Sequence, residues 1–191
     1  MFDQCRWLNE PARWSLDAAG LTVVTDASTD FWRETHYGFT RHSGHVFGRD
    51  AAEGFTATVR VQGRYEQLYD QAGLMVLVDE KTWIKAGVEW ADDKALLASV
   101  LTVGQSDWAV GALESDASNF WLRATVDAGV LRLQVSQDGR LWPLVRLCPF
   151  PRSERYFVGP MCCTPERSGL EVRFSEFSIG PALRKDLHDL S

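Results

Sequence analysis

The sequence predicts an all-β protein folded as a two-sheet antiparallel β-sandwich. Short apolar runs alternate with turn signals such as Ser43-Gly44 and Asp138-Gly139. Several runs alternate apolar and polar residues with a period of two, while helical periodicity is confined to residues 184–190. Evenly spaced short strands separated by such turns are typical of β-sandwiches and β-barrels. The 191 residues suit one domain, 1–191, because sandwiches often reach about 200–250 residues as one unit.

Charge and composition limit the classes of binding partner that the sequence predicts. The net charge is −6 and no basic cluster is present, so nucleic acid is not an expected partner. No apolar run is long enough for a membrane-spanning helix, so no membrane association is expected. The N-terminus lacks the basic and apolar stretches of a signal peptide. The four cysteines have no C-x-x-C spacing, which predicts free thiols and a cytoplasmic location.

Alternation also predicts how individual strands meet the core. In residues 55–61 the odd positions are apolar, and in 131–136 the apolar side again comprises alternate residues. Residues 136–142 predict a turn into a further strand. Near the end, Phe177 joins the apolar side of a late strand only if a β-bulge lies near Ser175 or Glu176.

Residues 69–90 predict a central hairpin whose second strand has two different faces. The core face carries Ile84, Ala86, Val88 and Trp90. The opposite face carries an aromatic residue, a cation, a glycine and an anion, namely Trp83, Lys85, Gly87 and Glu89. A glycine in the middle of a strand indicates close approach by a ligand or by another backbone.

A second strand, 120–127, repeats this pattern, with Trp121 and Arg123 pointing away from the core. If both strands share a sheet, its solvent face could stack a sugar ring on Trp while charged groups bind hydroxyls. Trp32 and His36 would form one wall of the groove. The candidate ligand-binding residues are Trp32, His36, His45, Asp70, Gln71, Trp83, Lys85, Glu89, Asp107, Trp108, Trp121 and Arg123. The alternative is an ordinary solvated face with cross-strand ion pairs.

No catalytic residues, metal ligands or cofactors are predicted. The sequence lacks the closely spaced carboxylates of glycosidases, a Gly-x-Ser-x-Gly motif and a phosphate loop. A hydrolase with Glu89 as base and Lys85 tuning it is an alternative. His42 and His45 could hold a metal only if a third ligand, such as Asp30, Glu34 or His36, converged on them.

Six short sequence motifs, in this order along the chain, resemble those of the domain-of-unknown-function family 1349. They are Thr29-Asp30-Phe31-Trp32, Tyr69-Asp70-Gln71-Ala72-Gly73-Leu74, Trp83-Ile84-Lys85-Ala86-Gly87-Val88-Glu89, Ser106-Asp107-Trp108, Ser136-Gln137-Asp138-Gly139 and Val158-Gly159-Pro160-Met161. The resemblance covers roughly residues 5 to 180 and implies a concanavalin A-like jelly roll of the lectin and glucanase type. Such folds commonly bind saccharides on the concave sheet face, which is an analogy of fold. Family members often carry an acid shortly before the Gly44-His45 pair, and if that acid helps to build the site, His45 has lost a partner here.

These observations favour a binding module for a carbohydrate or sugar-like metabolite. Two alternatives stay open. One is a protein-interaction or regulatory module acting on a metabolic enzyme, because the resembled family has a fungal member named for regulation of enolase. The other is an unrecognised hydrolase.

Overall fold

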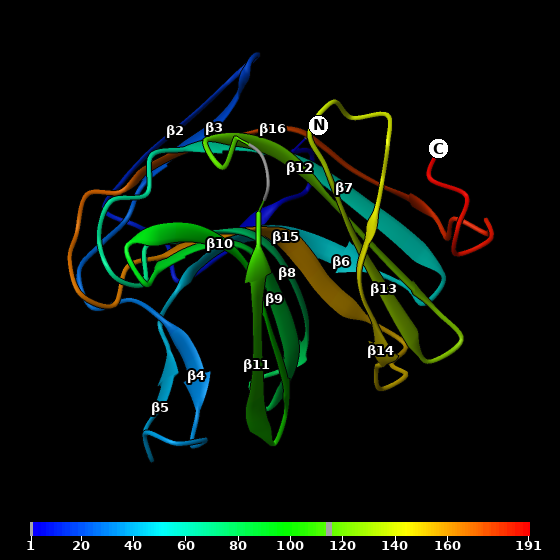
Figure 1. Ribbon diagram of the computed structural model, residues 1–191, viewed down its shortest axis with the longest axis horizontal. Helices are drawn as coiled ribbons and strands as arrows, with labels where there is room; N and C mark the ends of the chain where they lie inside the picture. Colours follow the sequence, from blue (N-terminus) through cyan, green and yellow to red (C-terminus); the bar gives the residue numbers. More distant parts are fainter. Residues whose placement is uncertain (1, 114–115) are drawn as a thin grey trace.

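Two antiparallel sheets of seven strands face each other in the computed structural model, which describes residues 2–113 and 116–191 (Figure 1). In spatial order, sheet A contains β1 (Arg6–Leu8), β6 (His45–Ala51), β15 (Tyr156–Cys163), β8 (Gln71–Asp79), β9 (Thr82–Ala91), β10 (Lys94–Val103) and β11 (Gln105–Ala112). Sheet B contains β14 (Leu144–Pro149), β13 (Val130–Ser136), β12 (Asn119–Asp127), β7 (Phe55–Gly63), β16 (Glu171–Pro181), β3 (Gly20–Val24) and β2 (Arg13–Asp17). The predicted β-sandwich is therefore confirmed.

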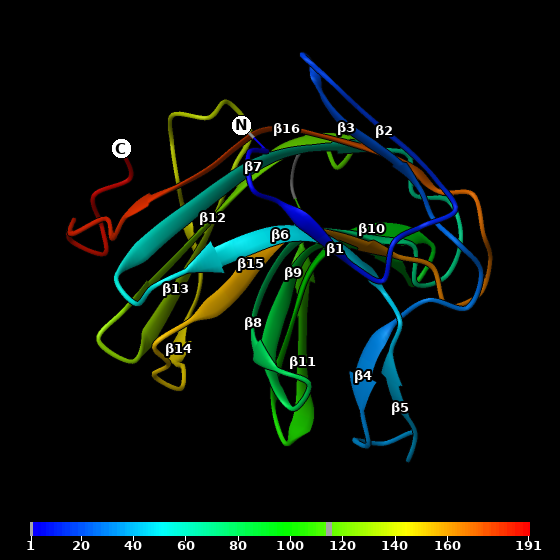
Figure 2. The ribbon, with the colours of Figure 1, turned by 180° about the vertical axis from the view of Figure 1, so that it is seen from behind.

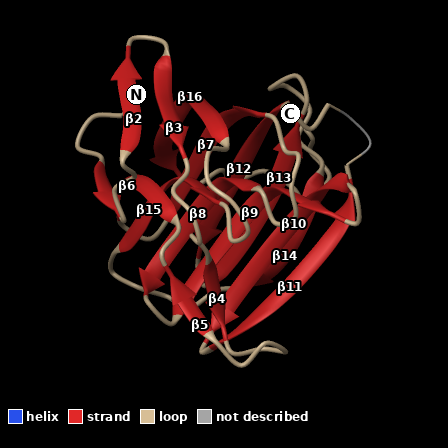
Figure 3. Cartoon of the chain, turned by 90° about the vertical axis from the view of Figure 1, so that its left-hand side faces the viewer, coloured by secondary structure: helices blue, strands red, loops and turns tan. Residues whose placement is uncertain are grey.

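A separate hairpin, β4 (Phe31–Arg33) with β5 (Thr40–His42), belongs to neither sheet. In Figures 1 and 2 it extends away from sheet B, alongside the strands of sheet A. Figure 3 shows it in front of sheet A. The hairpin therefore covers part of the face of sheet A that turns away from sheet B, which we call the concave face.

The core between the sheets follows the predicted alternation. In β7 the odd positions Phe55 to Val61 are buried, and in β9 Ile84, Ala86 and Val88 join the same cluster. Apolar side chains alternate in a strand because successive residues point to opposite faces, so one face of each sheet enters the core. The opposite face of β9 is left to build the concave surface.

The late strand β16 contains the predicted bulge. Its pairing with β7 shifts register between Ser175 and Ser178, and Glu176 has a φ of 54°. The extra residue returns Phe177 to the core side, where it is buried with Phe174.

No helix occurs among the described residues, so the helix expected at 184–190 is wrong: this segment contains a single turn at Leu187–His188. Its carbonyl groups instead accept hydrogen bonds from sheet B, for example from Arg132 to Lys185 O at 2.9 Å. Nothing within residues 2–113 and 116–191 has the length and apolar character of a membrane-spanning helix.

Two glycines in neighbouring strands bring the backbones of sheet A together. Gly73 in β8 pairs with Gly87 in β9. A Cβ on Gly87 would lie 2.0 Å from the carbonyl oxygen of Ala72, and one on Gly73 would lie 1.8 Å from that of Ala86. Of the two explanations for a glycine at this position, the structure supports approach by another backbone.

The strand that carries Trp121 and Arg123 does not share a sheet with the strand that carries Lys85 and Glu89, contrary to the possibility considered from the sequence. This strand, β12, lies in sheet B, so its outward face cannot share a surface with the concave face of sheet A. The Trp121 indole donates to Glu176 Oε2 at 2.9 Å, and the Arg123 guanidinium stacks over Trp142 at 4.3 Å. Alternation identified the outward residues correctly, but it carries no information about which sheet a strand joins.

Candidate functional site

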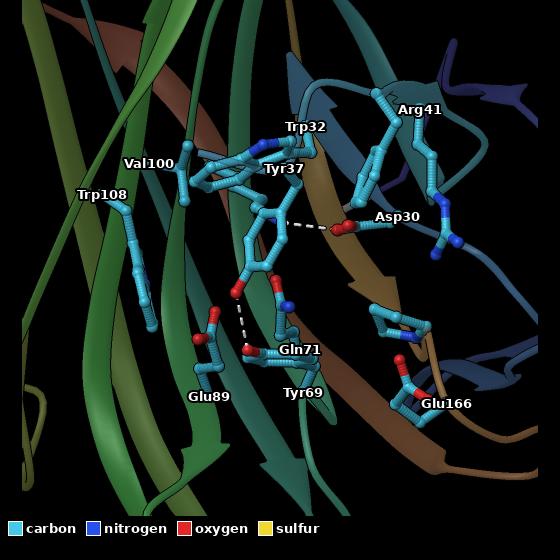
Figure 4. Close-up of a pocket in the computed structure, with 13 residues that line it drawn as sticks. Asp30, Trp32, Tyr37, Arg41, Tyr69, Gln71, Glu89, Val100, Trp108 and Glu166 are labelled. Atoms are coloured by element: carbon cyan, nitrogen blue, oxygen red, sulfur yellow. Dashed lines mark hydrogen bonds and ion pairs between the residues drawn. The ribbon is translucent and has the colours of Figure 1, made fainter. Parts of the chain in front are cut away.

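A pocket of about 250 Å³ opens between the β4–β5 hairpin and the concave face of sheet A (Figure 4). Sheet A contributes Gln71, Lys85, Glu89, Val100 and Trp108. The hairpin and the residues next to it contribute Asp30, Trp32, Tyr37, Phe39 and Arg41. Tyr69, Pro165 and Glu166 come from the segments that precede β8 and follow β15.

Strand register explains why the sheet residues converge. Gln71 lies opposite Glu89, and Val100 lies opposite both Lys85 and Trp108. Residues paired across neighbouring strands point to the same face of a sheet, with their Cβ atoms close together. The pocket floor is therefore specified by the pairing of four consecutive strands, β8 to β11.

A buried ion pair joins the hairpin to the sheet. Lys85 Nζ donates to Asp30 Oδ1 at 2.9 Å, and both side chains are buried. Burial by itself lowers the pKa of Lys85, but the negative charges of Asp30, Cys163 and Glu89 and the hydrogen bond to Asp30 together outweigh it and raise that pKa above its ordinary value. Lys85 is therefore charged, and its charge is neutralised by Asp30.

Asp30 also organises the hairpin itself. Its Oδ1 accepts from the backbone N–H of Phe31 at 2.8 Å, and its carbonyl oxygen accepts from Ser43 N and Gly44 N at 2.8 and 3.0 Å. The ion pair with Lys85 thus fixes both ends of the β4–β5 hairpin against sheet A. Trp32, which lies within this hairpin, is positioned by the same contacts.

Glu89 is buried in the floor without a partner. Glu89 is only 3% exposed, and no residue in the described part of the chain forms a hydrogen bond or ion pair with its carboxylate. Burial raises its pKa to about 7, although Lys85 opposes the increase. Close to neutral pH this carboxyl therefore changes between its protonated and charged forms.

Aromatic rings form the walls of the pocket. The Tyr37 ring contacts those of Trp32 and Phe39, with centroid distances of 5.6 and 5.5 Å. The hydroxyls of Tyr37 and Tyr69 are hydrogen-bonded across the mouth at 3.0 Å, and this bond is the main cause that raises the pKa of Tyr69 to about 12. The Tyr69 ring in turn meets Trp108 edge to face at 6.5 Å.

Comparison with known proteins fits this architecture. Residues 7–182 match the family described as "Protein of unknown function (DUF1349)". The chain belongs to this family. It is 58% identical over 188 residues to "Regulation of enolase protein 1" of Saccharomyces cerevisiae, covering 98% of this chain and 95% of that protein. The family membership predicted from the six sequence motifs is thereby confirmed.

Solved structures share the fold of this DUF1349 domain. A functionally unknown protein from Saccharomyces cerevisiae superposes with a TM-score of 0.94 at 56% identity, covering 95% of this chain and 98% of that one. The GH43 protein BlXynB from Bacillus licheniformis gives a TM-score of 0.70 at 15% identity, covering 94% of this chain but 37% of that enzyme. At that identity the second likeness shows the fold alone.

Five of the twelve candidate residues predicted from the sequence of this DUF1349 domain line the pocket. They are Trp32, Gln71, Lys85, Glu89 and Trp108. Lys85 and Glu89 lie on the predicted face of β9, and Trp32 forms the expected wall from the hairpin. Trp108 was expected in a loop at the edge of the sheet but lies within strand β11.

Trp83 lies on the predicted face but is not available to a ligand. The β4–β5 hairpin covers it: its ring is fully buried and meets Phe31 edge to face at 5.9 Å. A stacking surface for a sugar must be open, so Trp83 is a core residue of the layer beneath the hairpin.

His45 and Asp70 are buried outside the pocket. Nε2 of His45 accepts from Asp26 N at 3.1 Å, so Nδ1 carries the proton that is donated to Asn9 O at 2.7 Å. In the absence of the acid that family members often carry, both ring nitrogens of His45 are therefore engaged by backbone groups. Asp70 is paired with Arg167, with its Oδ1 2.8 Å from Arg167 Nε, and this pair fixes the segment that holds Tyr69.

His36 and Asp107 are exposed and also lie outside the lining. His36 meets the Tyr37 ring edge to face in the loop between β4 and β5, with the ring centroids 4.8 Å apart. Asp107 precedes Trp108 in β11, so it points to the opposite face, where it pairs with Arg146 at 3.0 Å.

The hypothesis of a metal held by His42 and His45 is not supported. His42 packs edge to face on Phe31 at 4.9 Å, whereas His45 is committed to Asn9 and Asp26. Within the described ranges, no three or more His, Cys, Asp or Glu side chains are arranged to hold a metal ion.

Eight further residues line the pocket but are not among the candidates predicted from the sequence: Asp30, Tyr37, Phe39, Arg41, Tyr69, Val100, Pro165 and Glu166. One signal could have found two of them, because Phe39 and Arg41 are alternate residues at the start of a strand and so share one side of it. Asp30 was considered only as a metal ligand. Pro165 and Glu166 carry no local signal, since they reach the pocket only through the placement of β15 beside β8.

Proposed function

We propose that this protein binds a small, sugar-like metabolite in the pocket beside the β4–β5 hairpin. The observation that carries the proposal is the combination of aromatic walls with a floor of buried polar groups. Small-molecule sites are typically apolar cavities with a few convergent polar groups. Trp32 and Trp108 supply ring faces, while Gln71 and Glu89 supply groups that can bind hydroxyls.

The chemistry of the floor favours binding over hydrolysis. A retaining glycosidase needs two available carboxylates about 5–5.5 Å apart. Asp30 is held by Lys85 at 2.9 Å, which leaves Glu89 as the unengaged carboxyl in the floor. We therefore include no catalytic step in the proposed function.

Trp108→Ala is expected to abolish the thermal stabilisation that a bound sugar gives the wild type. A ligand at about a hundred times its Kd stabilises a protein by about 2.7 kcal/mol, which a thermal-shift screen detects readily. The screen uses monosaccharides, sugar alcohols and sugar phosphates. Trp14→Ala is the matched control, because Trp14 is 40% exposed and Trp108 is 39% exposed, and Trp14 lies in β2 of sheet B.

Each variant is compared with its own ligand-free midpoint, so that any loss of folding stability does not count as a loss of binding. The proposal expects Trp14→Ala to keep the ligand-induced shift and Trp108→Ala to lose it. Equal shifts in both variants would place the ligand elsewhere.

A regulatory role through a protein partner is the second candidate function. The name "Regulation of enolase protein 1", carried by the 58% identical relative, supports it. Sheet B also presents exposed apolar side chains near its β14 edge, namely Val130, Leu141, Leu144 and Leu147. Sedimentation of the protein mixed with purified enolase tests this role, and a Leu147→Asp variant tests the surface. Unchanged sedimentation of both components would contradict it.

The cysteines support the cytoplasmic location that forms part of the proposal. All four are free thiols, and three of them are buried. Buried free thiols are common in the reducing interior of cells. Fluorescence microscopy of the tagged protein tests the location.

A further inference from the structure

The unmatched carboxyl of Glu89 indicates which kind of ligand the pocket takes. Figure 4 shows this group between the Trp108 ring on one side and the Tyr37 and Tyr69 rings on the other. It is 97% buried, and no described side chain pairs with it. A buried charge without a partner is costly, so a carboxyl in this place either stays protonated or receives a cation.

No cation of the protein itself is available for Glu89. Lys85 is committed to Asp30 at 2.9 Å. Arg41 stacks over the Phe39 ring at 4.7 Å, and Figure 4 shows it on the far side of the pocket from Glu89. The other titratable groups nearby, Cys163 on β15, Tyr69 and Glu166, supply no positive charge.

The rings around Glu89 suit the same kind of ligand. The faces of Trp and Tyr attract cations through the ring quadrupole, and the attraction is strongest where water is excluded. Tyr37, Tyr69 and Trp108 are linked to one another by the hydroxyl bond at 3.0 Å and the ring contact at 6.5 Å. Together they place aromatic surface on two sides of a buried anion.

We propose that the ligand carries an ammonium group, which pairs with the Glu89 carboxylate and contacts the rings of Tyr37, Tyr69 and Trp108. This inference rests on the proposed small-molecule function and narrows it to cationic amines, such as amino sugar alcohols or alkylammonium compounds. Gln71, opposite Glu89 in the sheet, offers an amide to a neighbouring hydroxyl of the ligand.

The proposed pairing makes binding depend on pH. Glu89 must be deprotonated to pair with an ammonium group, and its pKa is about 7 in the empty pocket. Affinity for a permanently charged ligand is therefore expected to increase about tenfold per pH unit below that pKa and to level off above it. The other titratable groups around Glu89 are Asp30, Lys85, Tyr69, Cys163 and Glu166, while Arg41 lies on the opposite side of the pocket.

The test uses two pairs of compounds that differ in charge and little else. Choline is compared with dimethylbutanol, its uncharged isostere, and glucamine is compared with sorbitol. Choline is charged at every pH, so its pH profile reports on the protein alone. Titration calorimetry at pH 6 and pH 8 is expected to show each amine binding at least about tenfold more tightly than its neutral partner at pH 8.

Variants at two carboxyls locate the interaction. Glu89→Gln is expected to remove both the preference for amines and the pH dependence of choline binding. Glu154→Gln, which changes an exposed carboxyl outside the pocket, is expected to keep both. Thermal melting of each variant without ligand confirms that it is folded.

The outcomes separate this inference from the proposed function. If sorbitol binds as tightly as glucamine, the pocket binds neutral polyols, so the function stands and the inference is overturned. A preference for amines that survives Glu89→Gln would overturn the assignment to Glu89. If none of the four compounds, and no sugar in the thermal screen, binds the wild type, both the inference and the small-molecule function fail.

Discussion

Asp30→Asn is expected to lower the free energy of unfolding by about 3–5 kcal/mol. The substitution removes the negative charge that neutralises Lys85 at 2.9 Å, while both positions are buried. Removing one partner of a buried ion pair costs this much because the other charge stays in a low-dielectric site without compensation. Urea denaturation monitored by tryptophan fluorescence measures the change at pH 7.

A double variant shows whether the loss of stability comes from the unpaired charge of Lys85 or from the altered packing of the site. In Asp30→Asn combined with Lys85→Met no charge is stranded, so the double variant is expected to recover most of the lost stability. Met follows the unbranched stem of Lys and adapts to irregular cavities. A single variant within about 1 kcal/mol of the wild type would show that Lys85 finds another partner or water.

Glu89→Gln is expected to make the protein more stable than the wild type above pH 7. The pKa of Glu89 is about 7 in the folded state and 4.5 in the reference state. The folded wild type therefore binds the proton more tightly, and it loses stability as the pH rises from about 4.5 to about 7. The loss amounts to about 3 kcal/mol, and Gln does not incur it because it does not titrate.

The measurement is the difference in unfolding free energy between variant and wild type at pH 4, 6 and 8. This difference is expected to grow in favour of Glu89→Gln over that range and to stay level above it. Glu154→Gln, at an exposed carboxyl outside the pocket, is the control and is expected to leave the pH dependence of the wild type in place. A constant difference for Glu89→Gln would mean that the carboxyl is solvated or paired in solution.

The parts of the structure that follow from local alternation could be predicted from the sequence. The β8–β9 hairpin, the two faces of β9 and the bulge at Glu176 are of this kind. Sheet membership could not be predicted in this way, because the faces of β9 and β12 have the same pattern although the strands lie in different sheets.

The pocket depends on contacts between distant residues, and these carry no local signal. Asp30 and Lys85 are 55 positions apart, and the layer that covers Trp83 comes from Phe31. Sequence patterns therefore predicted the polar residues of the floor, but not the hairpin that turns an open sheet face into a pocket. The same hairpin explains why Trp83, the most conspicuous aromatic of β9, was wrongly predicted to contact a ligand.

The position of β15 has a consequence for how the molecule folds. This strand, Tyr156–Cys163, pairs with β6 on one side and with β8 on the other, and both of these strands lie roughly a hundred residues earlier in the chain. Contacts between residues so far apart in the sequence form slowly. Until β15 arrives, both of those strands present unpaired edges, which are prone to pair with other chains. Pro165 and Glu166 lie two and three residues after the end of β15, so the pocket is completed only when this strand has been inserted. We expect slow refolding with a concentration-dependent loss to aggregation, and binding activity that returns no earlier than the final kinetic phase.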